Sequence, residues 1–197
     1  MRIVLASHNR GKIAELQSIL SVHFPDVEIL SPEQVGFYED IEETGASFSE
    51  NALIKAQALV RSGYISVGDD SGLCVRALNG APGIYSARYA GEHGDDAANL
   101  DLLLHNMADQ TDRAAAFYCC IACAFPDGRE PIVCEGVVEG ELLHARRGEG
   151  GFGYDPIFYY PPFEQTFGEM SAADKNKISH RARALEAFAA ELNRQLR

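Results

Sequence analysis

The chain has 197 residues, of which 46% are hydrophobic and 23% are charged. This length and composition are typical of a globular protein with a sizeable core, and we expect a single domain over residues 1–197. The formal net charge of −12 argues against a broad surface for nucleic acid or an anionic membrane, so a phosphate ligand would need a local basic pocket.

The apolar segments are too short for a targeting signal or a membrane span. A short apolar run after Arg2 ends at Ser7, and the run from residue 114 to 125 falls well short of the roughly 20 residues that a span needs. The 5 cysteines include a C-x-x-C at Cys120 and Cys123, but no second pair at zinc-site spacing. We interpret them as buried reduced thiols, which predicts a cytoplasmic protein.

The first segment predicts a strand and then a helix. Residues 2–6 form an apolar run, and Ile13, Leu16 and Leu20 follow at helical spacing. The loop between them, residues 7–12, carries a glycine and a lysine where βα loops bind phosphate. It is not a Walker A loop, because Ala6 stands where that motif needs glycine. An ordinary surface loop is the alternative.

The next segment predicts a short strand, an acidic connection and a second helix. Residues 27–30 are the strand, and the connection up to Gly45 contains Glu42 and Glu43. The sequence Ser47-Phe48-Ser49-Glu50 is a capping box, so a helix begins there. Lys55 on this helix stands between two acidic clusters, although a lone helical lysine is usually solvated.

The stretch Asp69-Asp70-Ser71-Gly72 follows a short β-prone run that begins at Ile65. We expect a strand to end at the two aspartates, because ligand sites of open α/β sheets lie at strand ends. Adjacent carboxylates repel each other, and a divalent cation would offset their charge. The alternative is a solvated acidic turn, since Asp, Ser and Gly are common turn residues.

The second half predicts a helix, a hairpin and a glycine-rich loop. The helix covers residues 95–106, and the long strands 114–125 and 132–143 are joined by a turn at 126–128. Residues 146–155 form a basic, glycine-rich loop in which Phe152 and Tyr154 could stack on a base, and residues 156–160 form another strand.

The C-terminal segment predicts one long helix that begins after Ser171 and keeps an apolar stripe as far as Leu196. Its first turns are unusually basic, with Lys175, Lys177, His180 and Arg181. Positive charge at a helix N-terminus is unfavourable against the macrodipole, so we expect an anion there. A solvated basic face is the alternative.

These residues together suggest a Mg²⁺-dependent enzyme that acts on a nucleotide-like phosphate. Mg²⁺ takes few carboxylates and keeps several waters, and phosphoryl transfer needs mainly positioning and charge neutralisation.

Several blocks of the sequence occur in an order that resembles a known family. They are Ser7-His8-Asn9-Arg10-Gly11-Lys12, Glu42-Glu43-Thr44-Gly45, Glu50-Asn51-Ala52, Lys55-Ala56, Asp69-Asp70-Ser71-Gly72-Leu73, residues 80–89, Gly150-Gly151-Phe152-Gly153-Tyr154-Asp155-Pro156 and Ser179-His180-Arg181. Together they resemble the inosine/xanthosine triphosphate pyrophosphatase family in its bacterial form, from residue 3 to about 190.

The resemblance implies an activity and a fold. The activity would be Mg²⁺-dependent hydrolysis of deaminated purine nucleoside triphosphates (dITP, ITP and XTP) to the monophosphate and pyrophosphate, which cleanses nucleotide pools. The fold would be α/β, an elongated mixed β-sheet flanked by helices, with two lobes around a central cleft. The protein would be a homodimer that binds a purine nucleoside triphosphate and neither nucleic acid nor a membrane.

The resemblance also assigns roles to residues. Asp70 would be the general base, Glu43 and Asp70 would face Mg²⁺, and Asp69 would support them. The substrate-binding residues would be Ser7, His8, Asn9, Arg10, Gly11, Lys12, Ser71, Phe152, Gly153, Tyr154, Asp155, Lys175, His180 and Arg181. His180, Arg181 or backbone donors would pair with O6 of the base, which adenine lacks.

Two other functions remain open at this point. A septum-associated pyrophosphatase of related fold would act on other nucleotides, but the blocks at 152–155 and 179–181 argue against it. A catalytically silent nucleotide-binding module would predict substitutions at Glu43, Asp69 or Asp70, and all three acids are present.

Overall fold

The structure, a computed structural model, describes residues 1–92 and 94–196. The strands and helices are, in chain order, β1 (Arg2–Leu5), α1 (Arg10–His23), β2 (Glu28–Leu30), α2 (Phe48–Leu59), β3 (Ile65–Val75), α3 (Asp96–Asn106), β4 (Ala114–Ala124), β5 (Ile132–Leu142), β6 (Phe158–Tyr160), β7 (Gln165–Thr166), α4 (Ala172–Ile178) and α5 (His180–Gln195). Short 3₁₀ turns lie between several of them, the longest at Gly83–Arg88.

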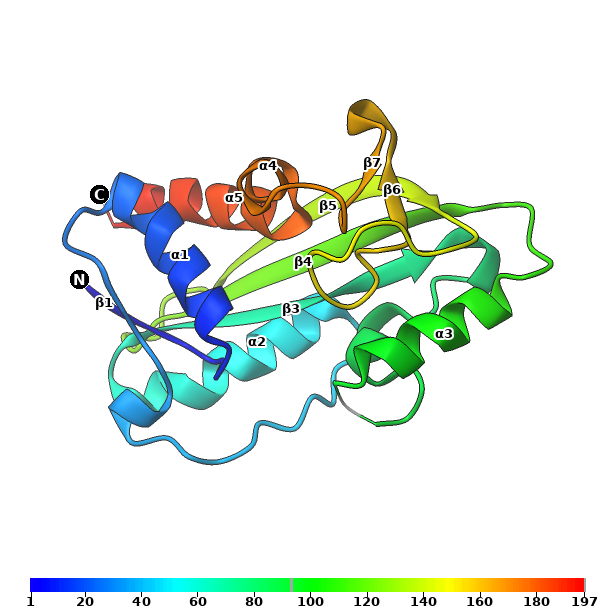
Figure 1. Cartoon of the computed structure of the whole chain (residues 1–197). Coiled ribbons are helices and arrows are strands. Elements are labelled where there is room, and N and C mark those ends of the chain that lie inside the picture. Colours follow the sequence, from blue (N-terminus) through cyan, green and yellow to red (C-terminus); the bar gives the residue numbers. More distant parts are fainter. Residues whose placement is uncertain (93, 197) are drawn as a thin grey trace. The chain divides into compact units, whose positions relative to one another are not determined.

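The sheet is mixed and open. Among the described residues it has 7 strands in the order β2-β1-β3-β4-β5-β6-β7 (Figure 1). Strand β1 pairs in parallel with β2 and β3, whereas β6 pairs antiparallel with β5 and β7. This arrangement confirms the expected α/β class with a mixed sheet and flanking helices.

The chain divides into two compact units. The first comprises residues 1–70, 119–136 and 181 onward, and the second comprises residues 71–118 and 137–180. Strands β3, β4 and β5 each contribute residues to both units, and each unit has a core of its own.

The core of the first unit has helices on both faces of its strands. Alternate strand residues, among them Leu5, Val67 and Ile121, pack with α1 and α5, where Leu20 and Phe188 are fully buried. The intervening strand residues pack with α2, as Figure 1 shows for the helix below these strands. The period of two along the strands therefore sorts the apolar side chains between two layers of helix.

The core of the second unit is aromatic. The ring of Phe117 lies 4.6 Å from that of Phe158 and 5.8 Å from that of Phe167, centroid to centroid. Leu100 and Leu103 of α3 belong to the same cluster. The helix predicted over residues 95–106 is present as α3, with Asp95 at its N-cap and its side chain accepting a hydrogen bond from the Ala98 amide.

Three local predictions were wrong. Strand β3 does not end at Asp69 and Asp70 but continues to Val75, so both aspartates lie within a strand. Helix α1 begins at Arg10, so Arg10, Gly11 and Lys12 belong to its first turn rather than to a loop. The predicted C-terminal helix is two helices, because the backbone of Ser179 is extended (φ −61°, ψ 154°).

Within the described residues, none of the helices combines the length and apolar content that crossing a membrane requires.

Candidate active site

Helix α2 lies unusually close to β3 at Gly68, the residue before the two aspartates. A Cβ at Gly68 would stand 2.0 Å from the carbonyl oxygen of Ala52 and 2.9 Å from the Cβ of Lys55. A real Cβ essentially never comes within 3.0 Å of such atoms, so only glycine allows this approach. As a result, the side chains of Asn51 and Lys55 reach the carboxylate of Asp70.

Lys55 holds two carboxylates together. Its Nζ donates to Oδ1 of Asp70 at 3.1 Å, lies 2.8 Å from Oε1 of Glu43, and donates to the backbone oxygen of Asp69 at 3.2 Å. The three side chains are mostly buried, with Lys55 12%, Asp70 10% and Glu43 26% exposed. The acidic connection before α2 and the middle of β3 therefore face one cation. This group (Glu43, Lys55 and Asp70) is called the Lys55 cluster below.

Burial and neighbouring charges shift the pKa values of Asp70 and Lys55. Burial raises the pKa of Asp70, and the nearby Glu43 adds to this, while Lys55 and Asn51 only partly offset it. Burial lowers the pKa of Lys55, but the carboxylates of Asp70 and Glu43 outweigh that effect and raise it. Asp70 is thus a carboxylate with increased proton affinity beside a lysine that stays charged.

Asp69 belongs to a second group of charges in the same unit. Its Oδ1 accepts from Nζ of Lys12 at 2.5 Å, and its Oδ2 accepts from Nε of Arg181 at 2.7 Å. The Sγ of Cys119 lies 3.7 Å from the same Oδ2, and Glu15 lies 3.8 Å from Nη1 of Arg181. Two cations thus meet on one carboxylate. Lys12, Asp69 and Arg181 are called the Asp69 triad below.

The Asp69 triad favours the ionised carboxylate. Burial alone would raise the pKa of Asp69, but the charges of Arg181 and Lys12 outweigh it and hold this pKa well below the ordinary range. The charge of Asp69 in turn raises the pKa of Arg181, against the effect of burial. Asp69 and Arg181 therefore both favour their charged forms.

The predicted phosphate-binding stretch forms the start of α1. The side chain of Asn9 caps this helix, because its Oδ1 accepts from the amides of Gly11 at 2.8 Å and Lys12 at 3.2 Å. Nδ1 of His8 lies 2.5 Å from Oε1 of Glu33, and Ser7 Oγ accepts from the Asn9 amide. The stretch provides a helix N-terminus with exposed Arg10 at its first position.

The glycine-rich loop of the second unit is organised by Asp155. Its Oδ2 accepts from the amide of Phe152 at 2.8 Å and from Nζ of Lys175. Gly151 has φ +76°, and a Cβ there would lie 2.1 Å from that Oδ2. Burial raises the pKa of Asp155, and the single cation Lys175 offsets this only in part. The carboxylate thus closes the loop on itself.

The aromatic residues of this loop are in different environments. Phe152 is 62% exposed, with Nζ of Lys175 4.6 Å from the centre of its ring. Tyr154 is buried, and its hydroxyl donates to the backbone oxygen of Ser86 at 2.9 Å. The ring of Phe152 is therefore accessible for stacking on a base, whereas Tyr154 packs in the core of the second unit.

The other predicted binding residues, His180, Ser71 and Gly153, belong to the second unit. His180 is buried in the second unit, where its ring stacks on Phe117 at 4.9 Å. Ser71 is partly buried on β3, directly after Asp70. Gly153 donates its amide to Oδ2 of Asp96 at 2.9 Å.

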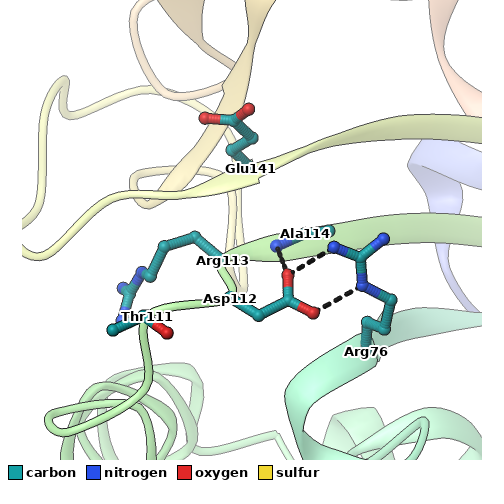
Figure 2. A pocket seen from close by; sticks show the side chains of 6 residues that line it. All are labelled: Arg76, Thr111, Asp112, Arg113, Ala114 and Glu141. Carbon is teal, nitrogen blue, oxygen red and sulfur yellow. Dashed lines mark hydrogen bonds and ion pairs between the residues drawn. The ribbon is translucent and has the colours of Figure 1, made fainter.

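The second unit also has a surface pocket. Figure 2 shows its lining residues, which are Arg76, Thr111, Asp112, Arg113, Ala114 and Glu141. The guanidinium of Arg76 binds Asp112 through two hydrogen bonds of 2.5 and 2.8 Å, and that of Arg113 donates to backbone oxygens of Met107, Leu142 and Leu143. None of the predicted site residues lines this pocket, so it is not part of the candidate active site.

Sequence reasoning missed three contacts of the site residues, those of Asn51, Asp96 and Cys119. Asn51 follows the glutamate of the capping box, and its place in the block Glu50-Asn51-Ala52 was the signal available. Asp96 and Cys119 gave no signal, because their contacts depend on long-range folding. Among the described residues, no three His, Cys, Asp or Glu side chains form a metal-binding group.

These features define an α/β protein in which each of the two units pairs buried carboxylates with cations, Asp69 and Asp70 in the first and Asp155 in the second. The sequence model of the Ham1 family matches residues 3–191. The chain belongs to the Ham1 family.

Named relatives match over almost the whole chain. A dITP/XTP pyrophosphatase of Streptomyces coelicolor is 51% identical over 95% of this chain and 94% of its own, and a dITP/XTP pyrophosphatase of Bacillus anthracis is 46% identical over 93% and 92%. The solved structure of a HAM1 protein from Coxiella burnetii is 42% identical, with a TM-score of 0.91 over 98% of this chain and 99% of that one.

Proposed function

We propose that this protein hydrolyses deaminated purine nucleoside triphosphates (dITP, ITP and XTP) to the monophosphate and pyrophosphate, with Mg²⁺ as cofactor. The names of its relatives support the substrate class. The observation that carries the proposal is the Lys55 cluster, in which the carboxylates of Glu43 and Asp70 share one cation. A homodimer in the cytoplasm belongs to the same proposal, and light scattering tests the dimer.

The Lys55 cluster fits the cofactor. Mg²⁺ is typically bound by one or two carboxylates together with substrate phosphates. The carboxylates of Glu43 and Asp70 already lie together, on the ammonium group of Lys55. These two residues would hold the ion. When bound, it would neutralise phosphate charge that develops during the reaction.

Asp70 would act as the general base. Its pKa is raised by burial, which brings its proton affinity closer to what a base needs at neutral pH. It would take a proton from a water molecule whose oxygen attacks the α-phosphorus. The bond from that phosphorus to the bridging oxygen would break, and pyrophosphate would leave with the electron pair. Lys55 and Asn51 each bind one oxygen of Asp70 and so orient it.

The Asp69 triad and the helix α1 start would bind the triphosphate. Lys12 and Arg181 would supply charged donors to phosphate oxygens, in addition to their ion pairs with Asp69 and, for Arg181, Glu15. The first-turn amides of α1 carry partial positive charge and would also donate to a phosphate. The phosphate would then compete with Oδ1 of Asn9, which accepts from the amides of Gly11 and Lys12.

The glycine-rich loop would bind the base. Phe152 would stack on the purine, and Lys175, Asp155, Gly153 and Tyr154 would fix the loop that presents it. Donors from His180, Arg181 or the backbone would pair with O6. Adenine carries an amino group there, so it would leave a buried donor unpaired, and such losses give strong discrimination.

The direct test is product analysis. The protein is incubated with Mg²⁺ and dITP, XTP, dATP or dGTP, and pyrophosphate and orthophosphate are measured separately. Pyrophosphate from dITP and XTP, with slow turnover of dATP, is the expected result. Orthophosphate as the product, or equal turnover of dATP, would overturn the proposal.

The role of Asp70 has its own test. Asp70→Asn keeps the size of the side chain but cannot take the proton, so we expect turnover of dITP to fall by about 10²- to 10⁴-fold, as for loss of a general base. Binding of dITP, measured by calorimetry, should stay detectable. Near-normal turnover would remove Asp70 from the base role.

A further inference from the structure

Asn51 is a fully buried polar side chain in the first unit, with 0% exposure. Its position is the fourth residue of α2, where an asparagine costs stability unless both ends of the amide have partners. Both ends do. Oδ1 accepts from the amide of Gly45 at 2.8 Å, and Nδ2 donates to Oδ2 of Asp70 at 3.2 Å. The chemistry fixes the orientation of the amide, because an N–H needs an acceptor and a carboxylate needs a donor.

The contact with Gly45 tethers the connection that carries Glu43. A Cβ at Gly45 would lie 2.7 Å from Oδ1 of Asn51, so the two groups meet as closely as glycine permits. The neighbouring Ala46 amide donates to Oε2 of Glu50 at 2.6 Å. Two consecutive backbone amides are therefore held by the start of α2, two and three residues after Glu43.

The contact with Asp70 fixes which oxygen faces the cation. Lys55 binds Oδ1 of Asp70, and Asn51 binds Oδ2. With Oδ2 held by the amide, rotation of the carboxylate is restricted and Oδ1 stays directed at the position it shares with Glu43.

We propose that Asn51 is a positioning residue that couples Glu43 to Asp70. It keeps both carboxylates directed at Lys55 and so holds together the two residues that would bind Mg²⁺. This inference rests on the proposed function for its catalytic part, since it assigns Asn51 to the reaction through Asp70. Side chains that orient the ligands of a metal typically change affinity or activity by about 10- to 100-fold when they are lost.

The chain contains a matched control. Asn99 is the fourth residue of α3 and is 1% exposed. Its Oδ1 accepts from the Ala90 amide at 2.7 Å, as Oδ1 of Asn51 does from Gly45, but its Nδ2 donates to the backbone oxygen of Ala87. Asn99 therefore shares the helix position, the burial and the loop tether, and lacks the carboxylate.

The experiment compares Asn51→Ala with Asn99→Ala. Both should lower the melting temperature, because each loses two buried hydrogen bonds. Only Asn51→Ala should lower kcat for dITP, by about 10- to 100-fold per folded molecule, and raise the Mg²⁺ concentration for half-maximal rate. Without substrate, binding of Mn²⁺, followed as loss of the free-ion paramagnetic resonance signal, should weaken in Asn51→Ala and not in Asn99→Ala.

A second variant covers the case in which Asn51→Ala does not fold. Gly45→Ala places a methyl group against Oδ1 of Asn51, and also against Cβ of Glu50 and the backbone nitrogen of Asn51, without removing a polar group. We expect weaker Mn²⁺ binding in the same direction. If kcat and Mn²⁺ affinity of both Asn51→Ala and Gly45→Ala lie within about twofold of the wild type, the positioning role is wrong. If the wild type releases no pyrophosphate from dITP, the proposed function fails, and the Mn²⁺ comparison still decides whether Asn51 positions the two carboxylates.

Discussion

Asp69 and Asp155 are almost equally buried, at 4% and 2% exposure, and yet their pKa values shift in opposite directions. Burial raises the pKa of both. Asp69 is paired with two cations, Arg181 and Lys12, which outweigh burial and lower its pKa. Among the described residues Asp155 is paired with Lys175 alone, and its pKa stays raised. One lysine does not offset the cost of burying a carboxylate, and two cations do.

The comparison separates two tasks. In the first unit the ionised Asp69 fixes Lys12 and Arg181 in place. In the second unit Asp155 closes the glycine-rich loop by accepting a hydrogen bond from the Phe152 amide. A carboxyl group accepts such a bond in both its ionised and its protonated form.

The largest expected effect is that of Asp69→Asn. Removing the charge takes from the buried guanidinium of Arg181 the carboxylate that pairs with it at 2.7 Å, so the free energy of unfolding should fall by about 3–5 kcal/mol. Urea denaturation measures it. Asp112→Asn, which breaks the exposed pair with Arg76, is the control and should change little. An equal loss of stability in the two variants would show that burial does not make the Asp69–Arg181 pair more important for stability than the exposed Asp112–Arg76 pair.

Lys175→Met should have a smaller effect. The variant removes the lysine that pairs with Asp155, but this carboxylate already has a raised pKa and can take up a proton, so we expect a loss of about 1–2 kcal/mol. The KM for dITP should rise as well, because Lys175 also lies over the Phe152 ring. A stability loss as large as that of Asp69→Asn would break the comparison between the two aspartates.

The two aspartates should also give opposite pH dependence. The pKa of Asp69 is lower in the folded state, so its stabilising effect is complete above the unfolded pKa and is lost as pH falls below it. The pKa of Asp155 is higher in the folded state, so stability is gained as pH falls through the folded pKa towards the unfolded one.

Unfolding curves between pH 7 and roughly pH 3.9, the ordinary Asp value, and then below it, measure this difference. The advantage of the wild type over Asp69→Asn should shrink below that value. Relative to Asp155→Asn, the wild type should gain stability as pH falls towards it. Parallel trends in the two comparisons would contradict the assigned shifts.

The smallest effect is expected for Cys119→Ala. The thiol contacts Oδ2 of Asp69 at 3.7 Å, a weak interaction beside two charged donors. We expect a loss of about 0.5–1.5 kcal/mol and an unchanged pH dependence below neutrality, measured by the same denaturation series. A shifted acid limb would mean that the thiol, and not only the cations, sets the pKa of Asp69.

Local signals in the sequence predicted much of the fold. The capping box at Ser47–Glu50 marks the start of α2, where the Glu50 amide donates to Ser47 Oγ at 3.2 Å. The prediction of a strand end at Asp69 and Asp70 was wrong, because Lys12, Arg181 and Lys55 stabilise carboxylates in mid-strand that isolated strand preferences disfavour. The break at Ser179 was missed, since no glycine or proline marks it.

The candidate site was predictable as a set of residues and not as a set of contacts. Which carboxylate each cation binds depends on side chains that are far apart in the sequence, as for Arg181 and Asp69. The different orientations of Phe152 and Tyr154 likewise follow from the aromatic core of the second unit rather than from their shared loop.

The closeness of α2 and β3 has a consequence for mutational tolerance. Gly68 carries no functional group, but the smallest side chain, a single methyl group, would meet the carbonyl oxygen of Ala52 at 2.0 Å. A substitution there would push the helix away and separate Asn51 and Lys55 from Asp70 without altering a charge. In a scan of all single substitutions, position 68 should be as intolerant as position 70. Intolerant positions would then include those that allow two backbones to approach closely, as well as those that react.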